Sequence, residues 1–136
     1  WECQELDLKK MIDSSKCLVG EHDFSSFRAV SCQSKSPIRK IYELEIRKIK
    51  DFFVITICAN GFLHHMVRNI AGVLIAVGTG KEKIKWVVDV LNAKDRKLAA
   101  VTAEPDGLYL VNINYPKRYS IPKPKKLIDN FKLNDF

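Results

Sequence analysis

The chain has 136 residues, of which 46% are hydrophobic and 29% charged, a composition typical of one globular domain with a hydrophobic core. Lys and Arg outnumber Asp and Glu by 23 to 16, and the resulting net charge of +7 favours a polyanionic partner, nucleic acid before membrane. No apolar run is long enough to cross a bilayer, and the first ten residues lack the pattern of a signal or transit peptide, so we expect no membrane partner.

The four cysteines are scattered along the chain, without a C-x-x-C pair and without clustered histidines. Such spacing favours free thiols in a reducing compartment over disulfides or a zinc site. We therefore expect a cytoplasmic protein that holds no metal.

The first half of the chain is expected to contain one helix and two strands. Apolar residues at helical spacing predict a helix over residues 6–19, closed by Gly20, and residues 21–37 show no clear periodicity and read as a long loop. Residues 38–50 alternate imperfectly between apolar and charged, as a half-exposed strand does. The following run, residues 52–62, is β-branched and aromatic, which predicts a strand covered on both faces and paired with the first as an antiparallel hairpin.

A helix beginning near His64 and ending at residues 78–80 is apolar over most of its circumference, which predicts burial. Arg68 lies in its first turn, although a guanidinium keeps its charge and the positive end of the helix dipole disfavours a cation. We therefore expect an anion beside Arg68. The alternative is an internal ion pair with Glu104 or Asp106.

The remaining elements complete an α-β-β-α-α-β order. Residues 81–93 predict a short amphipathic helix, and residues 108–115 predict a last strand ended by Pro116. The helix is expected to bury Ile84, Val87, Val88 and Leu91. This order predicts an α+β fold, a mostly antiparallel sheet with helices packed on one face, over residues 1–116. A basic, Pro-containing arm follows over residues 117–136.

Several segments, taken together and in order, are more specific than any one motif. They resemble the C-terminal half of the bacterial tRNA pseudouridine synthase A family, with H-H-M-V-R-N-I-x-G as the most distinctive motif, over about residues 6 to 124. The segments that carry this resemblance are GEHDFSSFRA, CQSKSPIRKI, ANGFLHHMVRNIAGVLIAVGTGK and AKDRKLAAVTAEPDGLYLVNINYP.

The resemblance implies an α+β half of a catalytic domain, a homodimer, no metal or organic cofactor, and action on uridines of the tRNA anticodon stem-loop. In the family an aspartate attacks the target uridine at the base or the sugar, and the arginine matching Arg68 lies beside that aspartate. Leu108 is expected to lie against the flipped base. The remaining candidates for substrate contact are basic: His64, His65, Arg28, Lys35, Arg39 and Arg96. His64 and His65 are adjacent, so their side chains are expected to diverge and not to bind one metal.

The family motif G-R-T-D-A-G-V-H, which carries the nucleophile, does not occur in this sequence, and neither does the motif with the tyrosine that stacks on the target base. We therefore expect that this chain is part of an enzyme and is inactive alone. Two other interpretations stay open: a tRNA-binding module without chemistry, and a dimerisation domain.

Overall fold

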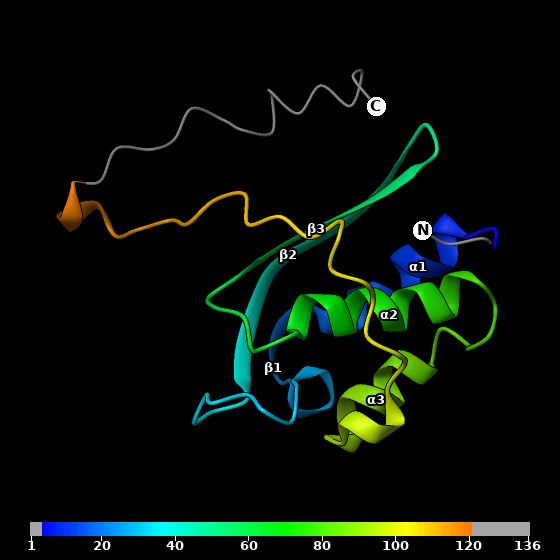
Figure 1. The fold of residues 1–136 in the computed structure, drawn as a ribbon, viewed down its shortest axis with the longest axis horizontal. Helices are drawn as coiled ribbons and strands as arrows, with labels where there is room; N and C mark the ends of the chain where they lie inside the picture. Colours follow the sequence, from blue (N-terminus) through cyan, green and yellow to red (C-terminus); the bar gives the residue numbers. More distant parts are fainter. Residues whose placement is uncertain (1–3, 121–136) are drawn as a thin grey trace. The chain divides into compact units, whose positions relative to one another are not determined.

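The computed structural model describes residues 4–120 and shows an α+β fold, as predicted (Figure 1). The chain divides into two compact units, residues 1–105 and residues 106–136. The helices and strands are α1 (Leu8–Ser15), β1 (Gly20–Asp23), β2 (Ile38–Ile49), β3 (Phe52–Ala59), α2 (Met66–Gly78) and α3 (Trp86–Ala93). Short 3-10 turns are η1 (Lys16–Leu18), η2 (Ser25–Phe27), η3 (Arg96–Leu98) and η4 (Lys117–Tyr119).

The sheet has the order β1-β2-β3, and both pairs are antiparallel. The predicted hairpin is confirmed: β2 and β3 pair from Ile49 opposite Phe52, and Lys50 in the turn adopts a positive φ of 53°. Strand β1 was not predicted. It has only four residues, and its place in the sheet follows from pairing with β2, which its own sequence does not encode.

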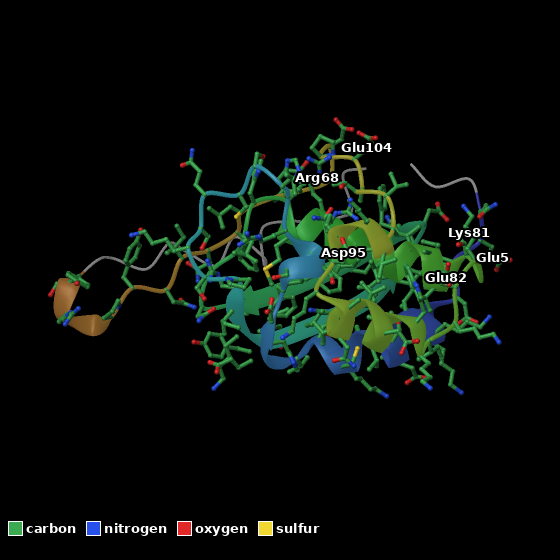
Figure 2. All side chains as sticks on the ribbon, turned by 90° about the horizontal axis from the view of Figure 1, so that it is seen from below. Glu5, Arg68, Lys81, Glu82, Asp95 and Glu104 are labelled. Atoms are coloured by element: carbon green, nitrogen blue, oxygen red, sulfur yellow. The ribbon has the colours of Figure 1, made fainter. Side chains whose placement is uncertain are left out.

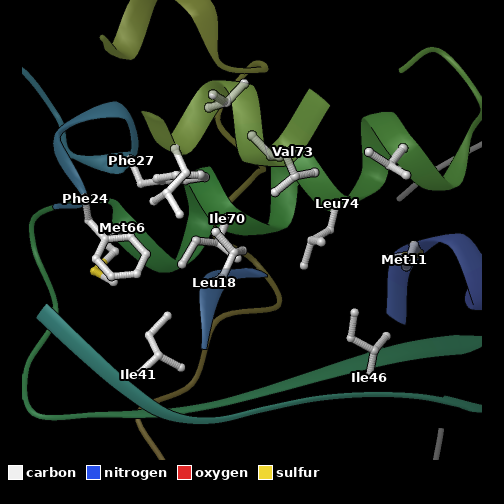
Figure 3. Packing of buried hydrophobic residues seen from close by; sticks show 14 of the residues in the cluster. Met11, Leu18, Phe24, Phe27, Ile41, Ile46, Met66, Ile70, Val73 and Leu74 are labelled. Atoms are coloured by element: carbon white, nitrogen blue, oxygen red, sulfur yellow. The ribbon is translucent and has the colours of Figure 1, made fainter. Parts of the chain in front are cut away.

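A bulge explains the imperfect alternation of β2. Ile41 pairs with Ala59 and Glu43 pairs with Cys58, so β2 carries one extra residue at Tyr42. The extra residue brings Ile41 and Ile46, five positions apart, to the same buried face, from which both point toward the helices (Figure 3).

Helix α2 is the centre of the core, as its apolar circumference predicted. Ile70, Val73, Leu74 and Val77 are fully buried, and Met11 of α1 joins the same cluster (Figure 3). The helix begins at Met66 and not at His64, because His65 adopts the left-handed conformation with φ 61°. No helix among the described residues has the length and apolar character needed to cross a bilayer.

The predicted interior face of the third helix was partly wrong. Val87, Val90 and Leu91 are buried, whereas Ile84 and Val88 are exposed. Ile84 lies before the helix, which begins at Trp86, and Val88 lies off the face that the i, i+3, i+4 positions 87, 90 and 91 share.

Two strand predictions also need correction. Strand β3 is an edge strand of the described sheet, and its residues are partly exposed rather than buried on both faces. Residues 108–115 form no strand, and Leu108, Leu110 and Ile113 are exposed. Alternating apolar residues make a strand only where a neighbour supplies the hydrogen-bond ladder, and residues 108–115 are not part of the described sheet.

Residues 101–103, which we call the strap, lie against α2. A Cβ built on Gly72 would overlap the carbonyl oxygen of Val101, so only a glycine permits this approach. The backbone N–H of Ala103 donates to the carbonyl of Arg68 at 3.2 Å. The strap is therefore fixed along the first turns of the helix.

We predict that Gly72→Ala destabilises the chain. Alanine in a helix interior normally gains about 1 kcal/mol over glycine. The new methyl group must displace the strap, at a net cost of roughly 1–3 kcal/mol. Urea denaturation of both forms measures this difference. Gly107→Ala is the control, because nothing lies within 4 Å of its Cβ, and a stabilised Gly72→Ala variant would refute the contact.

Candidate functional site

Arg68 is partly buried in the first turn of α2, and its guanidinium is held by the strap. Its Nε donates to the carbonyl oxygen of Ala103 at 2.7 Å. Arg68 and Glu104 appear in the same region of Figure 2, yet no ion pair between described residues involves Arg68. Because a carbonyl oxygen is neutral, the positive charge of Arg68 is not neutralised by this contact.

Asn69, the next residue of α2, is fully buried and organises a second arginine. Its Nδ2 donates to the carbonyl of Phe27 at 2.7 Å, and its Oδ1 accepts from Thr102 Oγ1 at 2.7 Å and from Arg96 Nη2 at 3.1 Å. Arg96 Nη2 also donates to Thr102 Oγ1 at 2.9 Å. These bonds restrain the side chain of Arg96 although η3, where it lies, is a single turn.

Asn69 and Thr102 were not among the residues predicted to form the site. The available signal was an amide within an otherwise apolar helix, since a buried amide must find partners. Its partners lie 33 and 42 residues away and become visible only in the fold.

The two histidines lie together and do not diverge as expected. Their ring centroids are 4.0 Å apart, because both precede the helix and His65 is in the left-handed conformation. Desolvation lowers the pKa of His65 below its usual 6.5, and the positive charges of His64, Arg68 and Arg96 lower it further. Three basic groups thus act on His65, an arrangement that favours an anion.

Three other predicted residues lie on or beside the loop before β2. Arg28 Nη1 donates to the Ser34 carbonyl at 3.4 Å, and Arg39 Nη2 donates to Ser34 Oγ at 2.8 Å. Lys35 is exposed. The loop is joined to the helix start, because the Ala29 N–H donates to the His64 carbonyl at 2.9 Å.

The structure therefore brings six predicted residues of the first unit into two neighbouring basic groups. One is Arg28 on the loop with Arg39 at the start of β2, and the other, around the start of α2, is His64, His65, Arg68 and Arg96. Leu108 belongs to the second unit, where 48% of its surface is exposed. No group of three or more potential metal-ligating side chains (His, Cys, Asp or Glu) was found within residues 4–120.

The fold and these basic groups define an α+β protein with a site suited to a polyanion. A family model described as tRNA pseudouridine synthase matches residues 15–116, and the chain belongs to this family.

Three relatives that the chain is similar to are tRNA pseudouridine synthase A proteins. The chain is 56% identical to the Legionella pneumophila protein over 121 residues, and this alignment covers 89% of the chain and 46% of the relative. It is 54% identical over 123 residues to the Nitrosococcus oceani protein, covering 90% of this chain and 48% of the relative. The Coxiella burnetii protein is 51% identical over 123 residues, covering 90% of this chain and 47% of the relative. The chain thus spans about half the length of the curated relatives it matches.

We predict that Arg68→Gln raises the pKa of His65. Removing one of the positive charges that disfavour protonation makes the imidazolium more favourable, so a larger fraction of His65 is protonated at pH 6. Titration of the ring carbon protons by NMR measures this change. A pKa that stays the same or falls would show that the Arg68 charge does not act on this ring.

We predict that Thr102→Val releases the side chain of Arg96. The substitution removes a hydroxyl that accepts from Arg96 and leaves only Asn69 to hold it. Nitrogen-15 relaxation of the Arg96 side chain should report faster motion, and unfolding should become easier by about 1 kcal/mol. Thr102→Ser keeps the hydroxyl and serves as the control. Equal Arg96 relaxation in the valine and serine variants would contradict the prediction.

Proposed function

We propose that this chain is part of a tRNA pseudouridine synthase, which converts uridine to pseudouridine in the tRNA anticodon stem-loop. The target base detaches, rotates and re-attaches to the ribose through carbon. Membership of the family supports the reaction class.

The observation that carries the proposal is the half-buried, unneutralised guanidinium of Arg68. Its Nε is engaged by Ala103, so its two Nη groups remain to bind both oxygens of a carboxylate. We assign this carboxylate to the aspartate nucleophile of the family, whose motif is not part of this sequence. The arginine favours the ionised aspartate and fixes its direction.

The other basic residues supply contacts to the tRNA backbone. Arg28, Lys35, Arg39 and Arg96 bind phosphates and set the position of the RNA without reading its sequence, with His64 and His65 beside them. Leu108 packs against the base that has left its stack. The working enzyme is a cytoplasmic homodimer that needs no metal or organic cofactor.

A second candidate function is a tRNA-binding module without chemistry. The net charge of +7 and the clustered basic side chains favour this function as much as they favour the enzymatic one. The two functions differ in what Arg68 does, since binding alone requires only its charge.

We predict that the purified 136-residue chain forms no pseudouridine and that mixing it with a matching N-terminal half restores activity. In that mixture Arg68→Lys should lower kcat by tenfold or more, because an ammonium cannot hold a carboxylate through two parallel bonds. Pseudouridine is measured by mass spectrometry of digested tRNA.

Arg47→Lys is the matched control, because Arg47 pairs with Glu45 on the exposed part of the hairpin. Full activity of Arg68→Lys would exclude the two-bond role. Tight tRNA binding by the mixture without isomerisation would support the binding module in its place.

A further inference from the structure

An open hollow of about 420 Å³ lies between the loop before β2 and the segment before α2. Its size falls within the roughly 300–1,000 Å³ range of small-ligand pockets. The proposed chemistry at Arg68 does not use it. The hollow is lined by Ser31, Cys32, Gln33, Ser34, Phe62, Leu63 and His64.

The hollow lies in a positive electrostatic environment. Arg28 and Arg39 are tied to Ser34 through its backbone carbonyl and its hydroxyl, and no ion pair between described residues involves either arginine. Their charges also act on Cys32, which lines the hollow. Hydrogen bonds from the backbone N–H groups of Ser34 and His64 lower the pKa of the Cys32 thiol, and the two guanidinium charges lower it further. An anion in the hollow would therefore be favoured.

The lining also offers what a nucleobase requires. Phe62 is 40% exposed, so an aromatic residue in the lining is accessible for stacking. The exposed residue Gln33 carries an amide that both donates and accepts, and the exposed residue Ser31 carries a hydroxyl that lies 3.3 Å from His64 Nδ1. Aromatic and polar groups thus line one small space, and two arginines are bonded to Ser34 in its wall.

We propose that this hollow is a nucleotide-binding subsite that takes one unstacked nucleotide of an RNA strand. The base lies against Phe62, and the adjoining phosphate is bound by Arg28 and Arg39. The proposal rests on the proposed function for the identity of the ligand as RNA. His64 lines the hollow, and its ring centroid lies 4.0 Å from that of His65, so the subsite adjoins the basic group around Arg68. We assign the subsite to a nucleotide other than the target uridine.

Cys32 provides a built-in reporter of this site. Iodoacetate is an anion and iodoacetamide is neutral. The rate of alkylation by iodoacetate divided by that by iodoacetamide at one thiol therefore reports the local electrostatic potential, because the accessibility of the thiol affects both rates alike. We expect this ratio to be roughly three- to tenfold higher at Cys32 than at Cys58, given two positive charges within several ångströms. Cys58 pairs across the sheet with Glu43 and lies outside the hollow.

Two variants control the comparison. Arg28→Gln should lower the ratio at Cys32 and leave Cys58 unchanged, whereas Arg47→Gln should change neither. Peptide-resolved mass spectrometry of the 136-residue chain gives both rates. An equal ratio at the two cysteines, or one that Arg28→Gln does not lower, would overturn the proposal.

The base is tested by protection of Cys32 from iodoacetamide. Unmodified tRNA and uridine 5′-monophosphate should slow the reaction at least threefold, and inorganic phosphate at the same concentration as the mononucleotide should not. Phe62→Leu, which keeps the apolar volume and loses the ring, should abolish protection by the mononucleotide, and Phe62→Tyr should retain it. Equal protection by inorganic phosphate would mean a simple anion site, and absent protection would mean no site. Both results refute the subsite.

Failure of the subsite and failure of the proposed function are distinguishable. Pseudouridine formation by the reconstituted mixture, with Cys32 left unprotected by RNA, would refute the subsite alone. Protection of Cys32 in a mixture that forms no pseudouridine would support the subsite and refute the proposed chemistry.

Discussion

The approach of the strap to α2 is the contact on which the rest of the site depends. Gly72 lets the Val101 carbonyl reach the helix surface, which aligns the next two residues with the preceding turn of α2. Ala103 then accepts a hydrogen bond from Arg68, and Thr102 bonds directly to both Asn69 and Arg96. The strap, 35 residues from Arg68 and 6 residues from Arg96 in sequence, thus fixes two arginines whose long side chains are otherwise mobile. The cost is that no side chain is tolerated at one helical position.

Sequence patterns predicted the elements whose stability comes from their own periodicity. Helix α2 and the β2–β3 hairpin belong to this class, since an apolar circumference and a pair of alternating runs joined by a tight turn need little outside information. The predictions for β1 and for residues 108–115 were wrong in opposite ways. Strand β1 forms despite its short polar sequence because it pairs with β2, whereas residues 108–115 alternate and yet are not part of the described sheet.

The site was predictable to the extent that its residues violate a local rule. Arg68 breaks the pattern of an apolar helix and of the helix dipole, so the expectation of an anion beside it could be drawn from the sequence. Asn69 breaks the same pattern more weakly, and its partners Phe27 and Thr102 are set by tertiary contacts that no spacing encodes. The prediction that the side chains of His64 and His65 diverge was wrong. Adjacent side chains diverge within a helix, but the left-handed conformation of His65, before α2, changes the direction of its side chain.

The electrostatics of the site explain why it is built from neutral acceptors. Arg68 is held by a carbonyl and Arg96 by an amide and a hydroxyl oxygen, so each cation is positioned without being neutralised. A carboxylate in place of these neutral acceptors would hold the arginine equally firmly. It would, however, neutralise the positive charge and compete with the anion that we propose to bind there. Desolvation is the largest cause of the lowered pKa of His65, and the nearby positive charges lower it further because they disfavour one more proton. Binding of an anion relieves this repulsion, and part of the cost of gathering the cations is recovered in affinity.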